Sequence, residues 1–156
     1  MTAPADSCTV WYMKVQDEIT IGAPAATVWD VYADVERWPT WTASVTTLEL
    51  LDGPSLAIGA RARIAQPRFP RLVWTVTAIE PGMSWTWVTR SPGATTTATH
   101  EVRRVDDATT RVVQTIEHRG PLGALVGRLT RRLTRRYLAM EAAGLRQRAE
   151  SRVASS

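Results

Sequence analysis

The segment from Leu122 to about Glu150 constrains the fold most, because its apolar residues recur at helical spacing for roughly seven turns. Gly120 and Pro121 precede this segment, and proline is favoured in the first turn of a helix. An isolated helix is only marginally stable in water, so we expect its apolar side to pack against the rest of the chain. The predicted apolar stripe consists of Leu122, Leu125, Val126, Leu129, Leu133, Tyr137, Met140 and Gly144.

The opposite side of this predicted helix carries arginine. From Leu122 onward the chain has eight arginines and two acidic residues, which leaves 11 basic and 13 acidic residues before it. The net charge of +4 therefore belongs to the helix. Such a basic surface could bind nucleic acid, anionic lipid or an acidic protein. Nucleic acid is disfavoured, because no aromatic residue shares the side of the predicted helix that carries Arg128, Arg131, Arg132, Arg135 and Arg146.

Length and composition predict one domain. With 156 residues and 44% hydrophobic content, the chain can build one sizeable core, which we expect over residues 11–152 after a loose tail at 1–10. No stretch approaches the roughly 18 consecutive apolar residues of a membrane span, and no secretion signal is evident. Cys8 is the single cysteine and cannot form an internal disulfide, so a cytoplasmic protein is the simplest interpretation. A monomer and a homodimer are both compatible with this composition.

The residues before the helix predict two short helices and seven strands. Residues 12–21 alternate apolar and polar side chains, as a half-buried strand does. Short helices are expected at 25–32 and 35–38, with Asp34 capping the second and Pro39 ending it. Short turns join the later strands, which predicts an antiparallel meander. The six further strands are expected at 45–51, 60–65, 72–80, 83–91, 95–105 and 110–118.

Several motifs make residues 12–150 resemble a known family. The chain resembles the START and birch-pollen-allergen-like (SRPBCC) superfamily, and within it the bacterial polyketide cyclase/dehydrase group. The motifs are Ala23-Pro24, Val28-Trp29, Asp34, Trp38-Pro39-x-Trp41, Gly59, Trp74-x-Val76, Glu80-Pro81, Thr110-Arg111-Val112 and Gly120-Pro121.

The resemblance implies an α+β helix-grip fold, in which a seven-stranded antiparallel sheet wraps around the long C-terminal helix and leaves a cavity. It also implies a hydrophobic ligand and, if the protein is an enzyme, a cyclase or dehydratase that needs no cofactor. In aromatic polyketide cyclases of this fold, a serine and an arginine near the end of the first meander strand often line the pocket. Ala78 and Glu80 stand there in this chain, which puts that chemistry in doubt.

The turns fix a register for the meander and therefore a face for the cavity. Val76 is predicted opposite Trp87, Ala78 opposite Trp85, and His100 near Gln114. The resulting face would consist of Trp74, Val76, Ala78, Trp85, Trp87, Ala98, His100, Val102, Val112, Gln114, Ile116 and His118.

Three polar residues on this face are the candidate catalytic groups: His100, His118 and Gln114. An imidazole can act as a general acid or base on an enolisable carbonyl or a leaving hydroxyl. No third residue with suitable spacing accompanies the two histidines, so no metal site is predicted. The candidate ligand-binding residues are Trp74, Val76, Trp85, Trp87, Val102, Ile116, Leu129, Leu133 and Tyr137.

Three functions remain open at this point. The chain could bind a hydrophobic, aromatic or polyketide-like molecule and catalyse its cyclisation or dehydration. It could instead be a carrier or regulator that binds such a molecule without chemistry, in which case the polar groups of the cavity only satisfy one another. The third possible function is that the arginine-rich helix binds an anionic partner.

Overall fold

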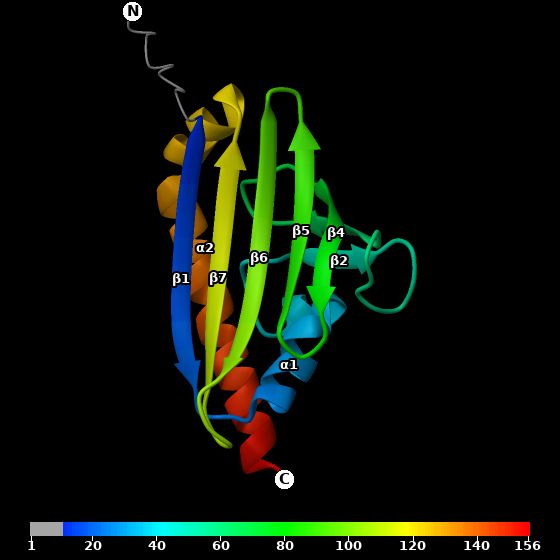
Figure 1. The fold of residues 1–156 in the computed structure, drawn as a ribbon, viewed down its shortest axis with the longest axis vertical. Helices are drawn as coiled ribbons and strands as arrows, with labels where there is room; N and C mark the ends of the chain where they lie inside the picture. The colour runs from blue at the N-terminus through cyan, green and yellow to red at the C-terminus, as the bar shows by residue number, and fades with distance from the viewer. Residues whose placement is uncertain (1–10) are drawn as a thin grey trace, which may run out of the picture.

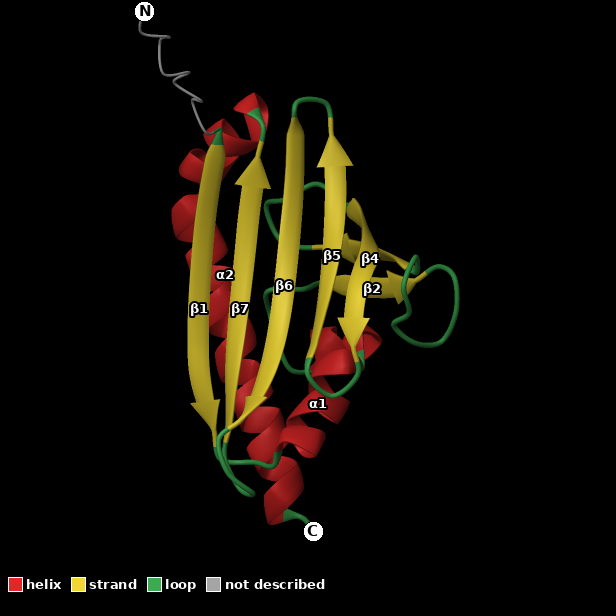
Figure 2. Cartoon of the chain, in the orientation of Figure 1, coloured by secondary structure: helices red, strands yellow, loops and turns green. Residues whose placement is uncertain are grey.

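A seven-stranded antiparallel sheet curves around one long helix in this computed structural model, which describes residues 11–156 (Figure 1; Figure 2). The predicted helix-grip architecture is confirmed. The predicted tail at 1–10 lies outside the described residues. The elements are β1 (Tyr12–Ile21), α1 (Ala25–Ala33), η1 (Val35–Thr40), β2 (Thr47–Leu50), β3 (Arg61–Ala65), β4 (Leu72–Glu80), β5 (Ser84–Ser91), β6 (Ala94–Arg104), β7 (Thr110–Arg119) and α2 (Pro121–Ala154).

The strands follow the order β1-β7-β6-β5-β4-β3-β2. The meander from β2 to β7 is therefore extended at its β7 edge by β1, the first strand of the chain. Tyr12 pairs with Arg119 and Ile21 with Thr110. α2 starts directly after β7 and runs back along the sheet behind β1 and β7 (Figure 1). This return places the long helix across the concave face, where a cavity can form.

The second short helix differs from the prediction. Residues 35–40 form a 3₁₀ helix that contains Pro39 instead of ending before it. The side chain of Asp34 makes no capping hydrogen bond, although its backbone carbonyl accepts one from the N–H of Arg37 at 3.1 Å. A turn this short needs few internal hydrogen bonds, so it tolerates the missing N–H of proline.

One β-bulge changes the predicted register. Val76 lies opposite Trp87 as predicted, but Ala78 pairs with Thr86 and Ile79 with Trp85, so the prediction of Ala78 opposite Trp85 is wrong. An extra residue reverses which side chains face the core, because side chains alternate along a strand. Ala78 is consequently exposed, while Ile79 packs against the core.

The side of α2 that meets the sheet also differs from the prediction. α2 is continuous, but Leu122, Leu125, Val126 and Leu129 are exposed. A Cβ on Gly127 would lie 2.7 Å from Cδ2 of His118, so only small residues fit where the helix approaches the strands. The buried residues are Gly123, Ala124, Gly127, Thr134, Tyr137, Leu138, Glu141, Ala142, Leu145 and Ala149.

α2 is arginine-rich on its outer side. Within residues 11–156, no helix combines the length and the apolar composition that crossing a bilayer requires.

Candidate functional site

A cavity of about 310 Å³ lies between α2 and the concave face of the sheet. Its exposed lining residues Pro70, Ser91 and Val126 mark the mouth, and its buried lining residues Trp38, His100 and Glu141 mark the deep end. The remaining lining residues are Val45, Ile64, Gln66, Phe69, Leu72, Trp74, Trp87, Thr89, Ala94, Thr96, Ala98, Ile116, His118, Gly123, Thr130, Thr134, Tyr137 and Leu138.

The sequence-predicted site residues fall into three groups. Trp74, Trp87, His100, Ile116, His118 and Tyr137 line the cavity. Val76, Trp85, Val102 and Gln114 are buried behind its wall. Leu129 is 77% exposed and Leu133 is half-buried on the outer side of α2, and neither lines the cavity.

A carboxyl group stands at the deep end of the cavity. Oε1 of Glu141 on α2 accepts hydrogen bonds from the hydroxyl of Tyr32 on α1 at 3.0 Å and from Nε2 of Gln114 on β7 at 2.6 Å. Gln114 also donates to the Tyr32 hydroxyl at 2.7 Å. Nε2 of His100 on β6 lies 3.9 Å from the same carboxylate oxygen. Side chains from four elements, α1, β6, β7 and α2, therefore meet at one acidic group.

Burial keeps the side chains of Glu141 and His100 neutral near pH 7. It raises the pKa of Glu141 to about 8, against the hydrogen bonds from Tyr32 and Gln114, which favour the carboxylate. It lowers the pKa of His100 to about 3. A protonated carboxyl and a neutral imidazole thus face each other, and the carboxyl is the group with a pKa close to neutrality.

His118 is not a close partner of His100. It lies opposite Thr96 on β6, whereas Gln114 lies opposite His100, so the two histidines are separated by four residues along the sheet. Four residues of strand span roughly 13 Å. Nδ1 of His118 contacts Oγ1 of Thr96 at 3.0 Å, and burial lowers the pKa of the ring. The two imidazoles therefore occupy different ends of the cavity.

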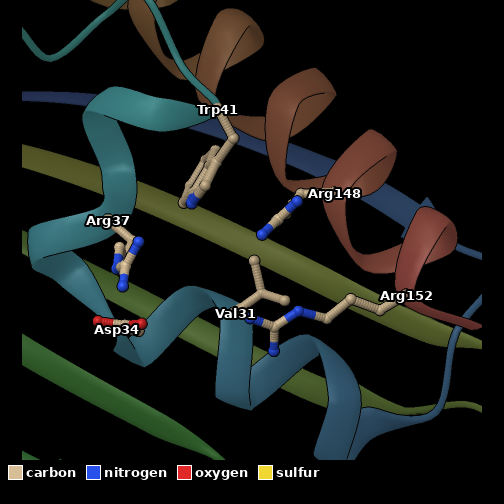
Figure 3. A pocket seen from close by; sticks show the side chains of 6 residues that line it. All are labelled: Val31, Asp34, Arg37, Trp41, Arg148 and Arg152. Carbon is tan, nitrogen blue, oxygen red and sulfur yellow. The ribbon is translucent and has the colours of Figure 1, made fainter.

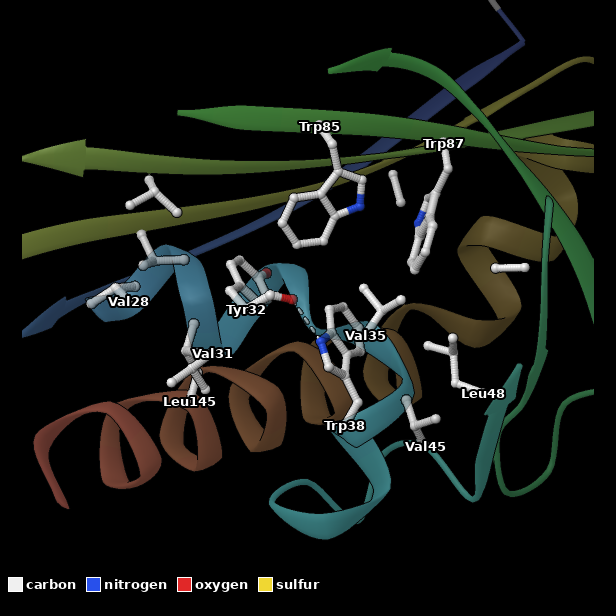
Figure 4. Packing of buried hydrophobic residues seen from close by; sticks show 14 of the residues in the cluster. Val28, Val31, Tyr32, Val35, Trp38, Val45, Leu48, Trp85, Trp87 and Leu145 are labelled. Carbon is white, nitrogen blue, oxygen red and sulfur yellow. Dashed lines mark hydrogen bonds between the residues drawn. The ribbon is translucent and has the colours of Figure 1, made fainter. Parts of the chain in front are cut away.

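Trp38, Trp85 and Trp87 form an aromatic cluster in the core (Figure 4), and all three rings contact His100. Trp85 is fully buried and stacks on His100, with ring centroids 4.3 Å apart and an interplanar angle of 10°. Trp38 donates from Nε1 to the backbone oxygen of Tyr32 at 2.8 Å, and its ring faces the cavity together with Trp87. Trp85 is thus a support of His100, while Trp38 and Trp87 are placed to touch a ligand.

The loop between β3 and β4 is tied to α2 near the mouth. Tyr137 donates its hydroxyl proton to the carbonyl of Pro67, and its ring meets Phe69 edge to face with centroids 5.8 Å apart. Gln66, Phe69 and Tyr137 all line the cavity. The position of this loop therefore affects access to the interior.

A second hollow, of about 180 Å³, lies between η1 and the C-terminal part of α2 (Figure 3). Arg37, Arg148, Arg152 and Asp34 surround it, and all four are exposed. Four of its six lining residues are charged, whereas the walls of the first cavity are mainly apolar, so the first cavity is the candidate site for a hydrophobic molecule.

Glu141, Tyr32 and Trp38 are site residues that sequence reasoning missed. One signal pointed to Glu141: it lies four residues after Tyr137 and four before Leu145, on the side of the helix that is buried. A carboxyl at such a position needs partners or a raised pKa. Its partners could not be identified from sequence, because Tyr32 and Gln114 lie 109 and 27 residues away. Within residues 11–156, no three His, Cys, Asp or Glu residues are arranged to hold a metal ion.

Solved structures with similar folds include two aromatase/cyclases and norcoclaurine synthase. The aromatase/cyclase ZhuI from Streptomyces sp. R1128 is 18% identical, with a TM-score of 0.74 over 91% of this chain and 96% of that chain. Norcoclaurine synthase from Thalictrum flavum, as a point mutant bound to a transition-state analogue, is 13% identical, with a TM-score of 0.71 over 90% of this chain and 96% of that chain. At these identities the likeness shows the fold alone.

A third similar structure is the di-domain aromatase/cyclase BexL of the BE-7585A biosynthetic pathway, which is 19% identical with a TM-score of 0.66. The match covers 88% of this chain and 46% of BexL. A comparison with curated protein sequences finds no match. The family described as "Polyketide cyclase / dehydrase and lipid transport" matches residues 12–150. Because this match covers nearly the whole chain, the protein belongs to the polyketide cyclase/dehydrase and lipid transport family.

Proposed function

We propose that this protein binds a hydrophobic, aromatic or polyketide-like molecule in the cavity under α2 and catalyses its cyclisation or dehydration with Glu141 as the acid. The observation that carries the proposal is the position of the Glu141 carboxyl at the buried end of an otherwise largely apolar cavity, where burial raises its pKa to about 8. Cavities with apolar walls and a few polar groups are typical of small-molecule sites, and 310 Å³ is near the lower end of their range of roughly 300–1,000 Å³.

A carboxyl with a pKa near the working pH suits both halves of a dehydration. The protonated Glu141 gives its proton to a leaving hydroxyl, and the C–O bond breaks as water departs. The resulting carboxylate then takes a proton from the carbon between the alcohol and a carbonyl, and that electron pair forms the new C=C bond. Glu141 ends protonated again, so no cofactor is consumed.

The other residues of the site have supporting roles in this proposal. Tyr32 and Gln114 hold Oε1 of Glu141, which leaves Oε2 to face the ligand. His100, neutral and stacked on Trp85, offers a hydrogen bond to a ligand oxygen. Trp38, Trp74 and Trp87 provide flat walls for a ring. His118 marks a second polar position nearer the mouth.

Two measurements test the proposal, one for binding and one for chemistry. Binding of naphthol-type compounds should quench tryptophan fluorescence saturably, and Ala98→Leu, which narrows the cavity, should weaken the binding. Dehydration of the benzaldehyde–acetone aldol, a β-hydroxy ketone, can be followed by the absorbance of its enone product. Glu141→Gln should reduce this rate by roughly 10²- to 10⁴-fold and leave binding nearly unchanged.

The alternative of a carrier or regulator without chemistry predicts a different pair of results. Under it, the wild-type protein would bind the compounds but would not accelerate dehydration of any β-hydroxy ketone tested. If the wild-type protein shows no saturable binding, both functions of the cavity are refuted.

A further inference from the structure

Four apolar side chains form an exposed stripe along the first turns of α2. Leu122, Leu125, Val126 and Leu129 follow the spacing of a single helical face and are 50%, 52%, 44% and 77% exposed. Trp11 lies at the start of this stripe, is 53% exposed, and accepts a hydrogen bond at its backbone oxygen from the N–H of Gly120 at 3.0 Å. Single exposed leucines are ordinary, but a contiguous row marks a surface that binds something apolar.

Arginines flank this apolar stripe. Arg128 lies three residues after Leu125, and Arg132 lies three residues after Leu129. Each arginine is therefore next to a leucine on the helix surface. Arg131, Arg135 and Arg136 are also exposed, and no acidic residue occurs from Pro121 to Met140. Among the described residues of α2, only Arg146 forms an ion pair with a carboxylate. The cations beside the stripe are therefore available to an anionic partner.

The stripe also borders the cavity. Val126 belongs to both, and its helical neighbours Gly123 and Thr130 line the cavity as well. An object that covers the stripe would consequently meet the mouth of the cavity.

We propose that the first half of α2 docks onto an anionic lipid surface. A helix with an apolar face and arginines beside it lies in the membrane interface, with the apolar side chains among the acyl chains and the guanidinium groups at the headgroups. Tryptophan is enriched at that depth, which suits Trp11. The docked orientation presents the cavity mouth to the lipid, so a hydrophobic molecule enters from the bilayer without crossing water.

A second copy of the chain fits this surface less well. The stripe has four side chains, whereas a stable dimer buries about 800 Å² on each partner. An antiparallel pairing through the stripe also brings the two arginine flanks to the same side, where they repel. A lipid surface supplies the negative charge that this arrangement needs.

Flotation with lipid vesicles tests the proposal on the full chain without any cavity ligand. The protein should float with vesicles of phosphatidylglycerol and phosphatidylcholine, float far less with phosphatidylcholine alone, and lose binding as salt rises. The double variant Leu125→Ser/Leu129→Ser should bind at least about tenfold more weakly. Arg128→Gln/Arg132→Gln should lose much of the preference for phosphatidylglycerol.

Matched controls change side chains of the same kind elsewhere. Ile58→Ser replaces an apolar side chain that is 71% exposed and lies outside α2. Arg90→Gln/Arg111→Gln removes two exposed arginines of the sheet. These controls should float like the wild type, and circular dichroism should show that every variant is folded. Equal flotation of the stripe variant and the wild type overturns the proposal. So does a dimer in light scattering that the stripe variant alone abolishes, or an acidic protein that binds the stripe while vesicles do not.

Discussion

Oε1 of Glu141 lies 3.0 Å from the hydroxyl of Tyr32, and this contact joins the middle of α2 to α1 across the core. Tyr32 is fully buried, and burial raises the pKa of its hydroxyl well above its ordinary value. The hydroxyl therefore keeps its proton and remains a donor to Glu141. The polar end of the cavity is thus part of the packing between helices as well as a candidate reaction centre.

Tyr32→Phe should raise the pKa of Glu141 and lower the stability of the protein. The hydrogen bond from Tyr32 lowers the pKa of Glu141, so its loss should raise that pKa above about 8. We expect the free energy of unfolding to fall by about 1–3 kcal/mol, because a buried carboxyl loses a partner. The measurements are urea denaturation and the pH dependence of the dehydration rate. Tyr12→Phe, at the half-buried edge strand, serves as a control and should leave the pH profile unchanged.

Stability should depend on pH in two opposite ways. Glu141 has a folded pKa of about 8, above its ordinary 4.5, so its contribution is full below pH 4.5 and is lost as pH rises towards 8. His100 has a folded pKa of about 3, below its ordinary 6.5, so its contribution is full above pH 6.5 and is lost as pH falls towards 3. The two slopes oppose each other between pH 4.5 and 6.5.

We therefore expect a plateau of stability at mildly acidic pH, a decline between pH 6.5 and 8, and a decline below pH 4.5. Denaturation midpoints measured across this pH range test the plateau and the two declines. Glu141→Gln should remove the alkaline decline specifically, and His100→Asn should remove much of the acidic one. If the alkaline decline persists in Glu141→Gln, another titrating group causes it.

Tyr137→Phe should open the cavity without changing its walls. The variant loses the hydrogen bond to the carbonyl of Pro67 but keeps the edge-to-face contact with Phe69. We expect faster association and dissociation of a fluorescence-quenching ligand, with rates higher by roughly threefold to tenfold for a loss of about 1 kcal/mol at the loop. Stopped-flow fluorescence measures both rates. Unchanged kinetics would mean that ligands enter away from residues 66–70.

The sequence patterns predicted the layers of this fold and missed three details: the 3₁₀ helix that contains Pro39, the β-bulge in β4 and the side of α2 that is buried. Turn residues such as Pro81-Gly82 delimit the strands, and the predicted neighbours Val76 with Trp87 and His100 with Gln114 are confirmed. The bulge between Val76 and Ala78 could not be foreseen, since no glycine or proline marks it. Hydrophobicity alone predicts the helix with its leucines inward, whereas close packing on β1 and β7 selects glycine and alanine.

The candidate site was predicted less completely than the fold. Strand alternation was sufficient to place His100, Trp74 and Trp87 on the concave face, because their neighbours are apolar. It could not show that Trp85 supports His100 from behind, since that depends on the stacking of two rings. It also gave no distance between the strands and α2, which is where Glu141 enters the cluster.

Two glycines of α2 should respond to alanine with opposite signs. A Cβ on Gly127 would lie 2.7 Å from Cδ2 of His118 and 2.9 Å from Cγ of Met13, so Gly127→Ala forces the helix away from the sheet. We expect a loss of about 1–3 kcal/mol in the free energy of unfolding. A Cβ on Gly123, one turn earlier, meets its nearest atoms at 3.5 Å, which is ordinary contact. Because alanine favours helix over glycine by about 1 kcal/mol, Gly123→Ala should stabilise the protein.

Urea denaturation of both variants measures these differences, and the positions share one helix and one buried face. Gly127→Ala should also displace His118 and so disturb the mouth of the cavity, which should weaken ligand binding. Equal stability of the two variants would show that α2 does not approach β1 and β7 as closely as the contacts of Gly127 require. In that case the small residues of the buried face would need another explanation, and the outward orientation of Leu125 and Leu129 would lose its physical cause.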